Sequence, residues 1–115
     1  MSSQEDINKK IEQFEALRQT YYAILLQKQK LKQQFDEIEN ALNELTKIDN
    51  TSPVYKLVGN IMIQRDKESL INELKEKKEV LDIRLQSLEK QEEKIKDKLE
   101  KLQIELESLL KAKKQ

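Results

Sequence analysis

Apolar residues recur at heptad spacing along the first part of the chain. Residues 4–48 contain neither Gly nor Pro, and the first and fourth positions of successive heptads are almost all apolar. A stripe with a 3.5-residue period follows one side of a helix and is typical of a coiled coil. The pattern predicts a helix over residues 4–48, and Ser2 with Glu5 has the spacing of a capping box at its start. The stripe consists of Ile7, Lys10, Phe14, Leu17, Tyr21, Ile24, Lys28, Leu31, Phe35, Ile38, Leu42 and Leu45.

A second segment, residues 67–114, has the same spacing and predicts a second long helix. Asp66 precedes this segment and is a suitable N-cap, because its short carboxylate can accept hydrogen bonds from the first free amides. The second stripe consists of Ile71, Leu74, Lys78, Leu81, Leu85, Leu88, Glu92, Ile95, Leu99, Leu102, Leu106 and Leu109.

The two predicted helices are similar in length and a short connection joins them, so we expect them to pair antiparallel with each other. This pairing places Lys10 opposite the neighbourhood of Glu105, and it places Lys28 near the level of Glu92. Two explanations of these charges in the stripe are open. The long side chains extend past their neighbours to water, or charged pairs fix the register of two repetitive helices.

The connection contains the apolar stretch VYKLVGNIMI, residues 54–63. Pro53 ends any helical continuation, and Gly59 with Asn60 is a two-residue turn signal between β-rich segments. A Gly at the first turn position fits a type II′ turn. The stretch therefore predicts one β-hairpin with strands over residues 54–58 and 61–65, within a linker and hairpin segment at 53–65.

The predicted hairpin is apolar on both faces. Alternation places Tyr55, Leu57 and Met62 on one face, and the other face carries Val54, Val58, Ile61 and Ile63. An isolated two-stranded hairpin is marginal in water and leaves two edges open. It either caps its own coiled coil or joins the hairpins of other chains, and joining covers faces and edges together. We expect an oligomerisation surface made of Val54, Tyr55, Leu57, Val58, Gly59, Asn60, Ile61, Met62 and Ile63.

Composition narrows the function. The chain has 115 residues, of which 38% are charged and 4% aromatic, so we expect one elongated domain over residues 1–115 rather than a globule with a thick core. Lys plus Arg and Asp plus Glu are equal at 22 each, which argues against a nucleic-acid partner. With neither Cys nor His, we expect no disulfide, no metal, no cofactor and no enzyme activity.

The amino-terminal residues MSSQEDINKK contain no apolar signal region, and no apolar run approaches the roughly 20 residues that span a bilayer. We therefore expect a cytoplasmic protein without a membrane partner.

The order of a heptad helix, a short linker, V-Y-K-x-x-G-N-I-x-I and a second heptad helix resembles the β-type subunit of prefoldin, a hexameric co-chaperone of archaea and eukaryotes. The resemblance covers almost the whole chain, and the first helix resembles the Gln-rich first arm of that family. The α-type subunits carry two hairpins, for which this chain has no room. The matching hairpin residues are Val54, Tyr55, Lys56, Gly59, Asn60, Ile61 and Ile63.

The resemblance implies a hetero-hexamer of two α-type and four β-type subunits, in which the hairpins form a β-barrel platform and the coiled coils extend as tentacles. It also implies that the complex holds unfolded client proteins without ATP and passes them to a group II chaperonin. The tentacle tips are then the client-binding region, which in this chain comprises Ile7, Ile11, Phe14, Ile104, Leu106, Leu109 and Leu110.

Two alternatives remain open at this stage. Four of the tip residues also belong to the heptad stripes, whose line of contact between the helices is called the seam: Ile7, Phe14, Leu106 and Leu109. The residues of YYAILL at 21–26 either contact clients or add to local packing. The competing function is a structural coiled-coil adaptor that oligomerises through its hairpin and docks one specific folded partner.

Overall fold

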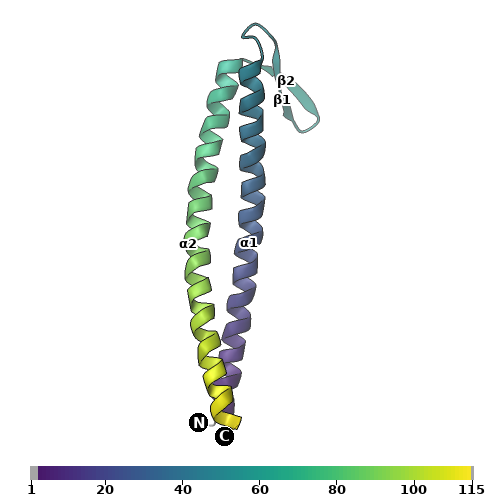
Figure 1. Cartoon of the computed structure of the whole chain (residues 1–115). Coiled ribbons are helices and arrows are strands. Elements are labelled where there is room, and N and C mark those ends of the chain that lie inside the picture. Colours follow the sequence, from purple (N-terminus) through teal and green to yellow (C-terminus); the bar gives the residue numbers. More distant parts are fainter. Residues whose placement is uncertain (1–2, 115) are drawn as a thin grey trace. The chain divides into compact units, whose positions relative to one another are not determined.

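The computed structural model describes residues 3–114 and contains two long helices with a two-stranded hairpin between them (Figure 1). Helix α1 spans Ser3–Lys47, strand β1 Val54–Val58, strand β2 Ile61–Arg65 and helix α2 Lys67–Lys114. The mainly helical fold expected from the heptads is therefore confirmed. Ser2, one half of the predicted capping box, lies outside the described residues.

The chain divides into two compact units. Among the described residues, the terminal unit combines 3–29 with 86–114, and the hairpin unit comprises 30–85. In both units the residues of the two heptad stripes are buried or half-buried, including the charged ones. The repeat thus predicted correctly which side of each helix would face the other.

In the terminal unit, α1 and α2 run antiparallel. Lys10 Nζ lies 2.6 Å from Glu105 Oε2, and Lys28 Nζ lies 2.9 Å from Glu92 Oε2. Both pairs confirm the alignment expected from the sequence. The buried apolar residues among the described part of this unit are Ile7, Ile24, Leu88 and Leu102.

In the hairpin unit, a small core forms where the helices meet the hairpin. Leu45 of α1, Val54 of β1 and Leu70 of α2 are buried together. Farther along the seam, Lys78 pairs with Glu39 at 3.2 Å, and its ammonium group also lies 5.3 Å from the centre of the Phe35 ring. The cation of this pair is on α2, whereas the seam cations of the terminal unit are on α1.

Local polar contacts lie at the end of α1 and at the start of α2. The amide of Ser69 donates to Asp66 Oδ2 at 3.1 Å, which confirms Asp66 as the N-cap of α2. Lys67 Nζ donates to the carbonyl of Ile48 at 2.7 Å and to Asn50 Oδ1 at 3.1 Å. Lys67 thereby ties the start of α2 to the carbonyl end of α1.

The hairpin has the predicted register and turn. Its strands pair antiparallel from Val54 opposite Arg65 to Val58 opposite Ile61. Among the described residues only Gly59 has a positive φ, +60°. A positive φ at the first turn residue and not at the second defines the type II′ turn that the sequence predicted.

Candidate interaction surfaces

The hairpin exposes its apolar side chains. Six of them have exposed fractions between 45% and 68%, and these are Tyr55, Leu57, Val58, Ile61, Met62 and Ile63. Val54, in contrast, is only 6% exposed and belongs to the core of the hairpin unit. Most of the predicted oligomerisation surface is therefore open to solvent in the single chain, whereas Val54 packs against the helices.

The two faces of the hairpin differ in their surroundings. Cross-strand pairing places Tyr55, Leu57, Met62 and Gln64 on one face, called here the outer face. The opposite, inner face carries Lys56 and Arg65 next to Val54, Val58, Ile61 and Ile63. This agrees with the alternation expected from the sequence. Within residues 3–114 no third strand pairs with β1 or β2, so both edges of the sheet lack a strand partner.

Glu73 of α2 binds both charged residues of the inner face. Lys56 Nζ donates to Glu73 Oε1 at 3.1 Å, and Arg65 Nη1 lies 3.6 Å from Glu73 Oε2. The hydrogen bond from Lys56 holds the pKa of Glu73 below the usual 4.5; partial burial opposes this shift, and the charges of Lys56 and Arg65 support it. The sequence pattern did not predict this cluster, although a lysine in the middle of an apolar strand is a signal for it.

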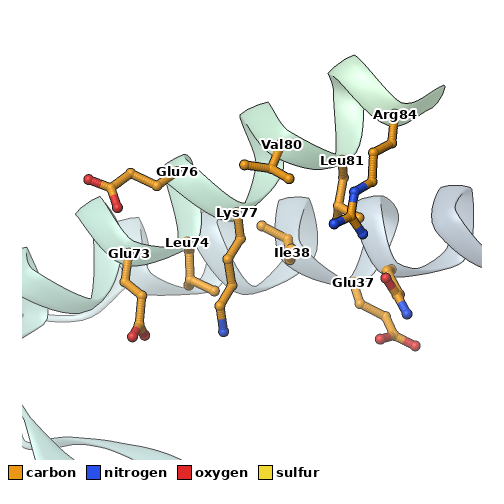
Figure 2. Close-up of a pocket in the computed structure, with 10 residues that line it drawn as sticks. Glu37, Ile38, Glu73, Leu74, Glu76, Lys77, Val80, Leu81 and Arg84 are labelled. Atoms are coloured by element: carbon orange, nitrogen blue, oxygen red, sulfur yellow. The ribbon is translucent and has the colours of Figure 1, made fainter. Parts of the chain in front are cut away.

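A groove of about 580 Å³ follows the two helices in the hairpin unit. Its apolar part is formed by Ile38, Leu74, Val80 and Leu81, and its rim is charged. Figure 2 shows Glu73, Leu74 and Lys77 projecting from α2 toward the same side. Glu73 thus lines the groove and binds the hairpin at the same time.

Apolar side chains are also exposed near the helix ends of the terminal unit. Ile11, Ile104 and Leu110 have exposed fractions of 44%, 66% and 46%. Of the other four residues predicted for this tip, Phe14, Leu106 and Leu109 are half-buried and Ile7 is 2% exposed. In this structure Ile7 belongs to the seam, so the free apolar surface is carried by the three residues outside it.

The YYAILL segment divides in the same way. Tyr21 and Ile24 face the seam, whereas Tyr22 and Leu26 are 60% and 55% exposed. Tyr21 and Tyr22 make an edge-to-face contact with ring centroids 6.1 Å apart. The segment therefore contributes both to packing and to a second exposed apolar area on α1.

No group of three or more potential metal ligands comes together within the described residues. Across residues 3–114, neither helix contains a stretch apolar enough to span a membrane. The exposed apolar side chains of the hairpin and of the helix ends are of the kind that contacts other proteins.

Comparison with known proteins gives a consistent result. The family model described as "Prefoldin subunit" matches residues 8–113. The chain is 42% identical over 85 residues to the prefoldin subunit beta of Archaeoglobus fulgidus, covering 74% of this chain and 73% of that protein. It is 39% identical over 83 residues to the prefoldin subunit beta of Thermococcus onnurineus, with 72% of both chains covered.

Solved structures show the same likeness. The crystal structure of the prefoldin beta subunit from Thermococcus strain KS-1 matches with a TM-score of 0.82 at 34% identity, covering 90% of each chain. The prefoldin beta2 subunit from the same strain matches with a TM-score of 0.72 at 20% identity, covering 79% of this chain and 97% of that one. The second likeness concerns the fold alone.

Proposed function

This chain belongs to the prefoldin family among its β-type subunits, and from that premise we propose that it holds unfolded proteins without ATP and delivers them to a group II chaperonin. Prefoldin subunits are chaperone components, so binding rather than catalysis is the activity to explain. The proposal includes a cytoplasmic location and one prefoldin-like domain over residues 1–115.

The single observation that best supports the proposal is the exposed apolar hairpin. Six apolar residues on a two-stranded sheet with two open edges are unfavourable in water unless another chain covers them. Prefoldin β-type subunits assemble with other prefoldin subunits, and hairpins of neighbouring subunits supply the missing strands and apolar faces. The proposed complex contains two α-type and four β-type subunits.

Client binding is assigned to the exposed residues of the terminal unit. Ile11, Ile104 and Leu110 are available without opening the seam, because their side chains lie outside it. Apolar residues separated by charged ones can contact unfolded chains while remaining too dispersed to aggregate with each other. Phe14, Leu106 and Leu109 add apolar surface where the last helical turns fray, and Ile7 contributes only when the helix ends separate.

The alternative is an adaptor that oligomerises through its hairpin and docks one folded partner. A docking site for one partner is a contiguous patch with a defined arrangement of apolar and polar groups. The exposed apolar residues of the terminal unit are instead single side chains on two helices, interspersed with charges. This arrangement favours many clients over one partner.

Light scattering tests the proposal directly. A chemically unfolded test protein is diluted into buffer without ATP, with and without this chain assembled with an α-type prefoldin subunit. We expect the complex to suppress aggregation, and we expect suppression to be lost when residues 1–12 and 104–115 are removed. A complex that forms but leaves aggregation unchanged would favour the adaptor.

Delivery needs a separate measurement. The client is labelled, bound to the complex and mixed with a group II chaperonin. The two complexes are then separated by size, and the label on each is measured. We expect transfer for the complete complex. A client that stays on the complex would contradict delivery while leaving the holding function intact.

A further inference from the structure

The hairpin is fixed to α2 by one carboxylate that binds two strands. Glu73 contacts Lys56 of β1 at 3.1 Å and Arg65 of β2 at 3.6 Å. Arg65 also donates from Nη2 to Ser69 Oγ at 3.4 Å. Lys56, Arg65 and Glu73 are half-buried, so solvent screens their ion pairs less than it screens a fully exposed pair.

These contacts define which face of the hairpin is turned toward the helices. Lys56, Arg65 and Val54 lie on the inner face, and all three contact the helical part of the hairpin unit. Successive side chains of a strand point to opposite sides, so Tyr55, Leu57 and Met62 point away from α2. The outer face carries no charged residue, because its fourth member is Gln64.

We propose that Glu73 is a positioning residue for subunit assembly, which holds the hairpin on the first turns of α2 so that its uncharged outer face meets the hairpin of a neighbouring prefoldin subunit. The inference rests on the proposed function, because it concerns how the subunits of the proposed complex join.

Two physical effects of Glu73 support this role. First, it compensates the charges of Lys56 and Arg65 on the inner face, and a charge left uncompensated in a small hairpin that becomes covered on assembly opposes association. Second, it restricts the rotation of a short hairpin that is otherwise held by Val54 alone among its apolar residues. A hairpin held in one orientation loses less conformational freedom when it binds its neighbour.

The oxygen atoms of Glu73 are used unequally. Oε1 accepts the hydrogen bond from Lys56, whereas the buried Oε2 accepts no hydrogen bond from the described residues and has Arg65 beside it at 3.6 Å. A carboxamide in place of this carboxylate keeps the shape but removes the charge that attracts both cations. Glu73→Gln is therefore the informative substitution.

The matched control is Glu76→Gln. Glu76 lies one helical turn farther along α2, is exposed, and forms no ion pair among the described residues. Both variants remove one negative charge from the same surface, so a difference between them reports on the contacts of Glu73 rather than on net charge.

The orientation of the hairpin can be measured in the full-length chain. Because the sequence contains no Cys, the pair Asn60→Cys and Glu79→Cys carries two spin labels at known sites, and electron paramagnetic resonance gives the distance between them. We expect one narrow distance in the parent and in the Glu76→Gln variant, and loss of that narrow peak in Glu73→Gln. A Glu73→Gln chain that keeps the narrow peak overturns the proposal.

Assembly is measured on the same unlabelled variants by mixing each with an α-type subunit and determining the concentration of half-assembly. We expect this concentration to rise about tenfold for Glu73→Gln and to stay unchanged for Glu76→Gln. Reversal of the pair, Lys56→Glu with Glu73→Lys, should recover part of the loss seen in either single variant. Circular dichroism serves as the control, because it checks whether helix content is equal in all variants.

The outcomes separate the two proposals. A Glu73→Gln chain that loses its fixed distance yet assembles like the parent overturns the role of Glu73 in assembly and leaves the proposed function standing. A parent chain that forms no complex with an α-type subunit overturns the proposed function itself, and the assembly role of Glu73 with it.

Discussion

Lys28 and Glu92 meet across the seam of the terminal unit, with Nζ of the lysine 2.9 Å from Oε2 of the glutamate. Both side chains occupy seam positions that are otherwise apolar, and their exposed fractions are 28% and 21%. The hydrogen bond to Glu92 raises the pKa of Lys28, while partial burial opposes that shift. The pair combines the two explanations left open by the sequence, because both side chains reach toward water and also bind each other.

Breaking this pair on one side should destabilise the chain more than replacing both partners. Lys28→Leu leaves the half-buried Glu92 carboxylate without its partner, and we expect a loss of about 1–2 kcal/mol in the free energy of unfolding. The double variant Lys28→Leu with Glu92→Leu should lie within about 1 kcal/mol of the parent, because both charges are gone. Urea unfolding followed by circular dichroism measures both values.

The control for this comparison is the exposed pair Glu15 and Arg18, which lies on α1 with a distance of 3.0 Å. Removal of either partner there should change stability by only about 0.5 kcal/mol. Equal losses at the exposed pair and at the seam pair would contradict a special contribution from Lys28 and Glu92.

The turn of the hairpin depends on Gly59. Its φ is +60°, and a Cβ added there would meet no atom within 4 Å, so substitution costs backbone strain without a steric clash. Gly59→Ala should destabilise the hairpin by about 1–2 kcal/mol and weaken assembly, while the helices stay intact. The loss of assembly is measured by titrating the Gly59→Ala variant with an α-type subunit.

Asn60→Ala is the matched control, because Asn60 has a negative φ that alanine adopts without strain. It removes a neighbouring side chain of the same turn. Should Gly59→Ala and Asn60→Ala weaken assembly equally, the conformation of Gly59 would not be the cause.

The hairpin and both helices could be predicted because each rests on a local signal: a heptad stripe, a cap such as Asp66, or the turn at Gly59. The contacts of Glu73 could not, because they join β1, β2 and α2 and depend on how the hairpin is oriented on the helix. Lys78 belongs to the heptad stripe of α2, but its partner Glu39 lies outside the seam of the other helix, where a heptad repeat gives no pairing rule. Which tip residues are free was likewise set by packing, as the burial of Ile7 shows.

Attachment of the hairpin should weaken in acid. The pKa of Glu73 is lowered in the folded chain, so its contribution is complete above the usual pKa of 4.5 and is lost as pH falls through the lower folded value. We expect the difference in free energy of unfolding between the parent and Glu73→Gln to be constant near neutral pH and to shrink as the pH falls below 4.5. Urea unfolding at a series of pH values measures it, and a difference that grows in acid would reverse the assigned sign.

Charges placed on the exposed hairpin should prevent assembly without unfolding the chain. Leu57 and Met62 lie opposite each other on the outer face and are 68% and 67% exposed, so Asp at both positions removes little packing within the chain but would bury two unpaired charges in the complex. We expect the Leu57→Asp, Met62→Asp variant to keep its helix content and to form no hexamer by analytical ultracentrifugation. Ile83→Asp is the control, because Ile83 is 61% exposed on α2, outside the hairpin. A hexamer that survives the double substitution would refute assembly through the hairpin.

Client holding should depend on the exposed residues of the terminal unit and not on the hairpin. Replacing Ile11, Ile104 and Leu110 by Ser removes apolar surface that is not needed by the seam, so assembly and stability should change little. We expect suppression of client aggregation to require several-fold more complex, since weaker contacts at each of several subunits multiply. The matched variant is Tyr22→Ser with Leu26→Ser, which removes exposed apolar surface elsewhere on α1. If the tip variant holds clients as well as the parent does while the Tyr22 and Leu26 variant fails, the client surface lies along YYAILL instead.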